Sequence, residues 1–168
     1  MSTTPVNPNV EAIRESVQTS YAELQQLIDG PLANLETNKL YEASTENEWT
    51  IMQNLWHIVE FMPYWAGEVE KVVAEPGRIF GRTAEDEGRL RGISEHEKDS
   101  LEKVKAALPG SYARLNEVLG TLKDSHLELI GKHVKYGERP VAWVITEFEA
   151  GHLKGHVEQI KGCLEVIG

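Results

Sequence analysis

The chain has 168 residues and a formal net charge of −10 at pH 7, which suits one domain with room for a core. Because nucleic acids and anionic membrane surfaces attract clustered Lys and Arg, this acidic balance argues against either as a partner. One cysteine, Cys163, rules out an intramolecular disulfide, and no stretch resembles a signal peptide or a transmembrane helix. We therefore expect a cytoplasmic protein with a single domain over residues 1–168.

Apolar residues recur every three or four positions in the first part of the chain, which is the period of a helix face. Residues 1–8 hold two prolines without such a period and are expected to form a flexible tail. The first helix ends at Gly30–Pro31. Its apolar stripe consists of Val10, Ile13, Val17, Tyr21, Leu24 and Ile28. A second helix is predicted after Thr50, a good N-cap, and Pro63 is expected to kink it.

The middle of the chain is predicted to form a long ordered loop, residues 77–92, and then a third helix. Ser94 and Glu97 have the spacing of a capping box at the start of that helix. The stripe continues across Pro109–Gly110, so we expect either one kinked helix or two collinear helices. It consists of Leu101, Val104, Leu108, Tyr112, Leu115, Leu119 and Leu122.

The last third of the chain begins with an irregular segment, residues 124–139. Residues 126–134 would suit a strand, but no partner is evident, so no sheet is predicted. Pro140 suits the first turn of a last helix that runs nearly to the C-terminus. Four long amphipathic helices bury their stripes most simply as an all-α four-helix bundle. The long connection between the second and third helices would allow a crossed chain path.

The second helix is apolar around almost its whole circumference, with Trp56, Phe61 and Trp65 among its side chains. We expect that one bundle does not cover all of this surface. A homodimer with a helix-mediated interface is therefore predicted.

Three histidines lie on apolar stretches of the predicted helices. His152 and His156 are four residues apart on the core stripe of the last helix, a spacing that can chelate one ion. His57 lies on the most apolar helix, where it could complete a three-ligand site with an open position. The alternative is that these rings are polar residues at a helix–helix seam. Gly151 and Gly155, one before each of the paired histidines, indicate close packing or access.

The three histidines lie in two of three stretches that together resemble the DinB/YfiT-like metalloprotein superfamily. The stretches are EWTIMQNLWHIVEF (residues 48–61), FGRTAEDEGR (80–89) and GERPVAWVITEFEAGHLKGHVEQI (137–160). The resemblance implies a bundle with up-down-down-up order and a homodimer. It also implies that His57, His152 and His156 bind zinc or nickel. Trp49–Thr50 matches the family's helix start, and Gln159 follows its HxxxH pair.

The resemblance further implies a function. Characterised relatives include metal-dependent transferases that act with a low-molecular-weight thiol, such as bacillithiol or mycothiol, on an electrophilic substrate. A divalent-metal-binding protein with such an activity is the leading hypothesis. A metal-dependent hydrolase and a non-catalytic, stress-related helical bundle remain the alternatives.

Several other polar residues have two interpretations each. Glu149, three residues before the histidine pair, could orient a ligand ring or act as a general base, or it could be a surface glutamate. Arg78 and Arg82 could recognise a carboxylate of a thiol cofactor or substrate, or belong to a solvated loop. His126 and His133 lie in the irregular segment and are not expected to reach the site.

Overall fold

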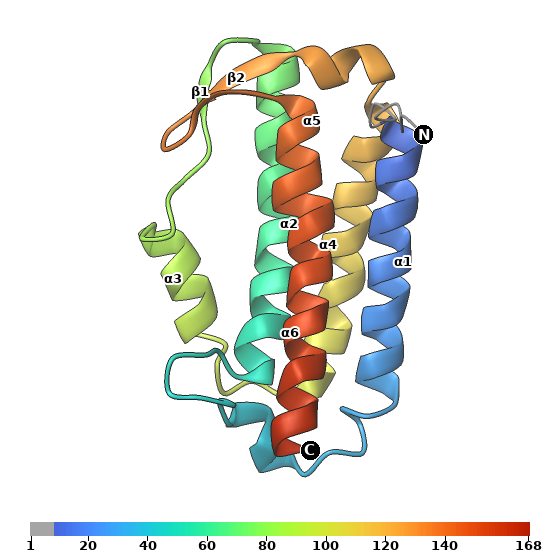
Figure 1. The fold of residues 1–168 in the computed structure, drawn as a ribbon, viewed down its shortest axis with the longest axis vertical. Helices are drawn as coiled ribbons and strands as arrows, with labels where there is room; N and C mark the ends of the chain where they lie inside the picture. Colours follow the sequence, from blue (N-terminus) through green and yellow to red (C-terminus); the bar gives the residue numbers. More distant parts are fainter. Residues whose placement is uncertain (1–8) are drawn as a thin grey trace, which may run out of the picture.

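The computed structural model describes residues 9–168, so the tail expected at residues 1–8 lies outside them. Four helical rods run along the molecule (Figure 1). They are α1 (Val10–Asp29), α2 (Ile51–Ala74), α4 (Leu101–Thr121) and a last rod made of α5 (Val141–Val144), the π-helical turn η3 (Ile145–Ala150) and α6 (Gly151–Ile167). The first and last rods run opposite to α2 and α4, which confirms the predicted four-helix bundle with up-down-down-up order.

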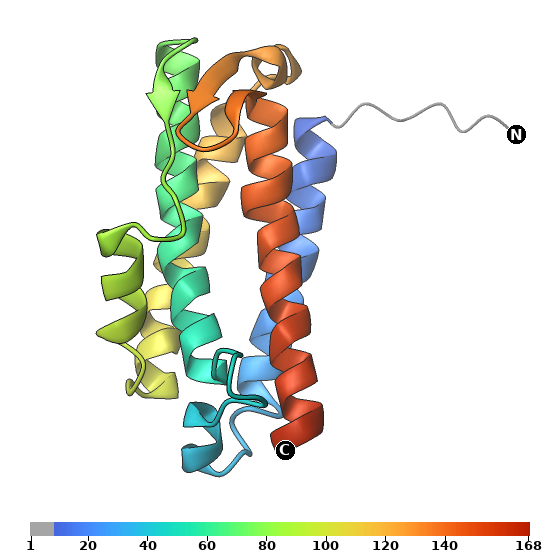
Figure 2. The same ribbon diagram turned by 60° about the vertical axis from the view of Figure 1, so that its left-hand side comes forward.

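The connection from α2 to α4 passes along the outside of the bundle (Figure 2). It was predicted to be a loop, but it contains the strand β1 (Ile79–Phe80) and the helix α3 (Glu87–Ser94). The side chain of Asp86 accepts the N–H of Arg89 and so caps α3. Short 3-10 helices, η1 (Thr37–Tyr41) and η2 (Asp124–Glu128), complete the helical elements of residues 9–168.

Helix α4 begins later than predicted. The capping box proposed at Ser94 and Glu97 is wrong, because Ser94 is the last residue of α3. Ser100 caps α4 instead, and its hydroxyl accepts the N–H of Lys103. The helix then continues through Pro109 as one element, which decides between the two predicted alternatives in favour of a single helix.

A small three-stranded sheet lies at one end of the bundle, where no sheet was predicted (Figure 1). Strand β2 (Ile130–His133) pairs antiparallel with β3 (Gly137–Pro140) and parallel with β1. The hairpin closes at Gly137, whose φ of 75° glycine adopts without strain. The Nδ1 of His133 accepts the N–H groups of Lys135 and Tyr136 in the same turn. The strand-like stretch therefore does have partners, one local and one distant in sequence.

Helix α2 is central and passes unbroken through a proline. Thr50 and Gln53 form a capping box at its start. Because Pro63 has no N–H, the carbonyl of Val59 loses its helical partner. The Ser111 hydroxyl, on α4, donates to that carbonyl at 2.7 Å. The bond explains why a serine is buried between these two helices.

The apolar circumference of α2 is covered within one chain. Trp56, Phe61 and Trp65 are all buried, and α2 packs against α3, α4, α6 and β1. The argument for a homodimer from this helix is therefore wrong, and the homodimer stays a prediction from the family resemblance. Among residues 9–168, no helix combines the length and the apolar character that a membrane span requires.

The hydrogen bond between Ser111 and Val59 can be tested by a double-mutant cycle. Ser111→Ala should lower the free energy of unfolding by about 1–2 kcal/mol, because it leaves a buried carbonyl without a donor. In a Pro63→Ala background the same change should cost less, since the new backbone N–H can serve that carbonyl. Urea unfolding of the four proteins measures both losses, and equal losses would contradict this account.

Candidate metal centre

Three histidine rings meet between α2 and α6. One ring nitrogen each from His57, His152 and His156 lies within 4.8 Å of the other two. The Nε2 atoms of His57 and His152 are 3.3 Å apart. Nitrogens bound to a tetrahedral zinc ion at ~2.0–2.1 Å are separated by roughly 3.3–3.4 Å. The pair therefore already has the spacing of one edge of such a site, and the donor set fits a divalent cation.

Aromatic side chains pack around the three rings. Phe61, one turn after His57, stacks on His152 with ring centroids 4.2 Å apart. Trp49 stacks on His156 at 5.7 Å and meets the edge of His57 at 4.9 Å. These contacts exclude water from the ring faces without competing for the ring nitrogens.

Asn54 fixes the orientation of His156. The Nδ1–H of His156 donates to the side-chain oxygen of Asn54 at 2.7 Å, and the Asn54 amide donates to the carbonyl of Thr50 at 3.0 Å. This acceptor assigns the proton to Nδ1 and leaves the lone pair on Nε2 for a metal ion. Sequence reasoning missed Asn54, although an amide three residues before His57 on a highly apolar helix is a usable signal.

Burial keeps all three imidazoles neutral at pH 7. It lowers the pKa of His57 to about 2, that of His156 to about 3 and that of His152 to about 4. Burial is the largest cause of these lowered pKa values; neighbouring imidazoles contribute for His57 and His156, and the charge of Arg89 contributes for all three. Metal binding requires neutral rings, so the surroundings hold the cluster in the form that a cation needs.

The two glycines beside the histidine pair have different roles. Gly151 closes the π-helical turn η3 with a hydrogen bond to the carbonyl of Thr146, and a Cβ at this position would lie 2.8 Å from that oxygen. A Cβ on Gly155 would meet nothing within 4 Å, and Gly155 borders an open groove beside His152 and His156. Both glycines border that groove, and the geometry of the turn additionally requires the first to lack a Cβ. Wide turns of this kind often mark functional sites.

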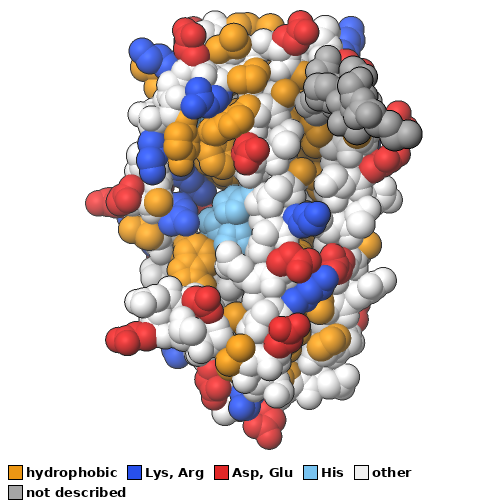
Figure 3. All heavy atoms as spheres, viewed as in Figure 1, with side chains coloured by type: hydrophobic (Ala, Val, Ile, Leu, Met, Phe, Trp, Pro, Cys, Tyr) orange, Lys and Arg blue, Asp and Glu red, His pale blue; other side chains and the backbone are white. Residues whose placement is uncertain are grey.

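A small cavity leads to the cluster from outside the bundle. It has a volume of about 150 Å³ and opens on His57 and His152. Arg82, Arg89 and Lys135 are among the residues that border it. Figure 3 shows histidine side chains at the surface, next to basic side chains. The rings are therefore largely buried but remain reachable for a small molecule.

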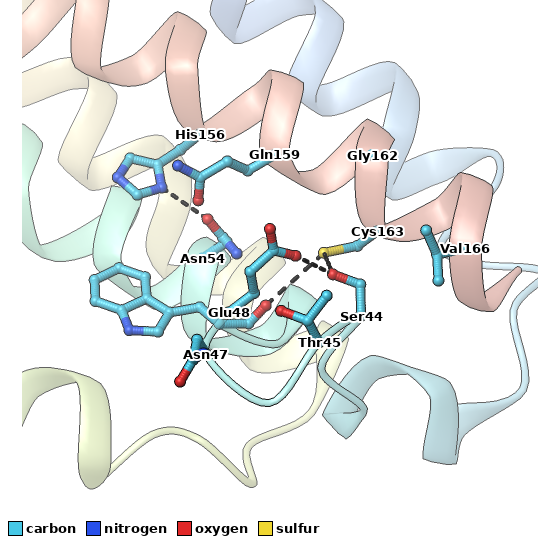
Figure 4. A pocket seen from close by; sticks show the side chains of 11 residues that line it. Ser44, Thr45, Asn47, Glu48, Asn54, His156, Gln159, Gly162, Cys163 and Val166 are labelled. Atoms are coloured by element: carbon cyan, nitrogen blue, oxygen red, sulfur yellow. Dashed lines mark hydrogen bonds between the residues drawn. The ribbon is translucent and has the colours of Figure 1, made fainter.

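A larger cavity of about 600 Å³ touches the cluster through Asn54 and His156 (Figure 4). Gln159, which is exposed, also borders it. Cys163 lies farther along α6, with its Sγ 3.8 Å from the carbonyl of Trp49. Burial raises the pKa of the Cys163 thiol, so it is a protonated side chain outside the histidine cluster.

The other predicted site residues differ in their burial and in their distance from the cluster. Glu149 is fully buried and neither carboxyl oxygen has a hydrogen-bond partner among residues 9–168, so its reading as a surface glutamate is wrong. Burial also raises its pKa well above the usual range. Arg82 borders the small cavity and pairs with Glu60, whereas Arg78 pairs with Glu75 and does not border that cavity.

His126 and His133 lie apart from the three-histidine cluster, as expected. The Nδ1 of His126 accepts the N–H of Lys123 at 3.0 Å. His133 is buried, and its ring stacks against the rings of Trp65 and Phe148, with centroids 5.9 Å and 5.5 Å away. Both imidazoles therefore serve local structure at this end of the bundle.

Comparison with protein families gives a match to the DinB superfamily over residues 17–160. YfiT from Bacillus subtilis, described as a probable metal-dependent hydrolase with an unusual four-helix bundle topology, is similar in structure. Its TM-score is 0.69 at 14% identity, and the match covers 96% of this chain and 91% of that chain. TT2238, described as a four-helix bundle protein, matches with a TM-score of 0.63 at 18% identity, over 91% of this chain and 98% of that one.

A third similar structure is the colibactin self-resistance protein ClbS, solved in complex with dsDNA. Its TM-score is 0.68 at 10% identity, and the match covers 97% of this chain and 99% of that chain. Likeness at such low identities establishes the fold and nothing finer. Comparison with curated proteins gave no match.

The three neutral imidazoles should make the metal-free protein sensitive to acid. Between about pH 6.5 and the lowered pKa values, an unfolded chain binds protons at these histidines that the folded chain does not. The folded state is therefore favoured above about pH 6.5 and loses stability as pH falls, by about 1.4 kcal/mol per pH unit for each histidine.

His57→Gln should remove one such proton. Urea unfolding in the presence of a chelator at pH 7, 6 and 5 should give a shallower decline for this variant than for wild type. The difference should approach about 1.4 kcal/mol per pH unit below about pH 6, where the unfolded imidazole is largely protonated. Identical slopes would show that the fold does not hold the His57 ring neutral.

Proposed function

This chain belongs to the DinB superfamily, and we propose that it binds one divalent metal ion through His57, His152 and His156 to activate a nucleophile. The observation that carries the proposal is the 3.3 Å approach of the Nε2 atoms of His57 and His152. Without a cation, these two nitrogens can form a single hydrogen bond, in which one Nε2–H donates and the other Nε2 accepts. A cation instead accepts the lone pairs of all three rings, including the Nε2 that Asn54 leaves free on His156.

Zinc or nickel is the proposed ion, because both accept neutral imidazole nitrogens. A bound divalent ion would lower the pKa of a thiol or a water molecule and so supply a nucleophile at neutral pH. The protein contributes the rest. Asn54 holds His156 in one orientation, Phe61 and Trp49 exclude water from the rings, and the 150 Å³ cavity admits the substrate.

We take a low-molecular-weight thiol as the nucleophile and a small electrophile as its acceptor, following the family resemblance. This makes the protein a metal-dependent thiol S-transferase. Metal-dependent hydrolysis is the second candidate, favoured by the structural likeness to YfiT. The net charge of −10 argues against a nucleic-acid partner, so we do not extend the dsDNA complex of ClbS to this protein.

Glu149 is the proposed acid–base residue. Its carboxyl is buried three residues before His152, and burial favours the protonated form. A cation bound nearby would favour the carboxylate. The Glu149 side chain would then be a proton donor in the metal-free protein and a proton acceptor in the metal-loaded protein.

Metal binding should stabilise the folded protein. At pH 7, zinc or nickel at a hundredfold excess over its Kd should raise the free energy of unfolding by about 2.7 kcal/mol. His156→Ala should lose most of that gain, since only two histidine ligands remain. The measurement is chemical unfolding of tag-free protein with and without metal.

Two further variants sharpen this test. Gln159→Ala, on the same helix and outside the cluster, should keep the full gain. Asn54→Ala should keep the ligands but lower the metal affinity by roughly 10–100-fold, because His156 loses its partner. A metal-dependent gain that persists in His156→Ala would contradict the proposed ligand set, and the absence of any gain in wild type would remove metal binding.

Activity assays then decide between the two nucleophiles. Metal-loaded protein is incubated with an electrophile in the presence of bacillithiol, mycothiol or glutathione, and in parallel with ester and amide substrates without thiol. Conjugation that needs both thiol and metal supports the transferase. Metal-dependent cleavage without thiol supports the hydrolase.

A further inference from the structure

Three basic side chains surround the small cavity that opens on His57 and His152. We call Arg82, Arg89 and Lys135 the basic mouth; they come from the β1–α3 connection, from α3 and from the β2–β3 hairpin. No Asp or Glu is among the residues that border this cavity. In a chain with a net charge of −10, the mouth is a local reversal of charge.

Only part of this positive charge is matched by the protein itself. The guanidinium of Arg82 pairs with Glu60 at 2.6 Å, lies 4.0 Å from Asp86 and stacks over Tyr64. Arg89 and Lys135 have no carboxylate within 4.0 Å among residues 9–168. Two cations at the cavity are therefore available to a ligand.

The contacts of these two cations are with a backbone carbonyl and with aromatic rings, and they leave the positive charges without a counter-ion in the described part of the chain. Arg89 donates to the carbonyl of Ala84 at 2.9 Å and lies 5.5 Å from the centre of the Trp49 ring. The ammonium of Lys135 lies 5.4 Å from the centre of the Tyr136 ring.

The same cavity also has an apolar wall. Trp65 and Phe148 border it and stack on each other with centroids 4.3 Å apart and an interplanar angle of 12°. Tyr136 adds a third ring to the lining. These rings give the cavity an aromatic wall, which suits contact with an apolar ligand body.

We propose that this cavity binds a small substrate with an anionic carboxylate or phosphate group on a flat apolar body, and that Arg89 and Lys135 hold the anion. A guanidinium presents paired N–H donors that match two oxygens of such a group. The proposal rests on the proposed function, because the cavity opens on two of the three proposed ligands. It specifies the substrate class and two residues that select it.

Binding of simple probes tests the proposal. Benzoate and phenyl phosphate represent the two anions, and benzamide is a neutral molecule of nearly the same shape as benzoate. Titration calorimetry is carried out on zinc-loaded and on metal-free protein, with the zinc content of each sample measured. The variants are Arg89→Gln and Lys135→Gln. Arg91→Gln on α3 and Lys132→Gln on β2 are matched controls, because both residues are exposed and do not border the cavity.

Wild type should bind at least one of the two anions more tightly than benzamide. Arg89→Gln should weaken that anion about tenfold and Lys135→Gln about threefold, in line with one charged hydrogen bond and one exposed charge. Benzamide binding and both control variants should be unaffected. The tighter of the two anions identifies the group as a carboxylate or a phosphate.

Equal affinity for benzoate, phenyl phosphate and benzamide would overturn the proposal, and so would loss of anion binding in the controls to the same extent as in Arg89→Gln. The zinc measurement keeps the two proposals separate. Arg89→Gln protein that retains zinc but no longer prefers the anion supports the subsite. Wild type that binds no zinc but prefers the anion through Arg89 supports the subsite and removes the metal function.

Discussion

The hydrogen bond from the Nδ1–H of His156 to the oxygen of Asn54 joins α6 to α2 at the point where the three imidazoles meet. Both groups are buried, and a buried polar group left without its partner costs about 1–3 kcal/mol. The two helices are therefore favoured in the one register that pairs them. That register also brings the Nε2 atoms of His57 and His152 to 3.3 Å from each other. The geometry of the cluster thus depends on one interhelical bond, which the carbonyl of Thr50 supports from the start of α2.

The cluster is costly for the fold. His57 and His156 are 1% and 6% exposed, so neither ring can be charged without loss of stability. Glu149 adds a buried carboxyl without a partner among residues 9–168. A helix seam chosen for stability would use apolar side chains at such positions. Instead, three histidines direct their ring nitrogens toward one another, and two of them follow a π-helical turn. Buried polar residues in such an arrangement are expected at a functional site.

The four long helices and the pair His152 and His156 could be predicted because their signals are local: a helical period, a cap and a four-residue spacing. His57 is 95 residues from His152, and the family resemblance was needed to join it to the pair. The sheet could not be predicted, because β1 has only two residues and its partner strand lies far along the chain, so no period reveals it. Asn54 and Lys135 escaped prediction because their relation to the cluster depends on how α2 meets α6 and how the hairpin folds back. The dimer argument failed for a related reason. Sequence shows that the surface of α2 is apolar, but not which segments of the same chain cover it.

The bundle and the segments added to it have separable roles. The proposed ligands lie on α2 and α6, inside the bundle. The basic mouth lies outside it, on the β1–α3 connection, on α3 and on the β2–β3 hairpin. Substitutions in these outer segments can alter the charge and shape of the cavity without moving the histidines. The three similar structures share its fold at 10–18% identity, yet their descriptions range from a probable hydrolase to a colibactin self-resistance protein. The shared fold therefore does not specify a reaction. In this chain the substrate must be inferred from the side chains that the outer segments place over the cluster.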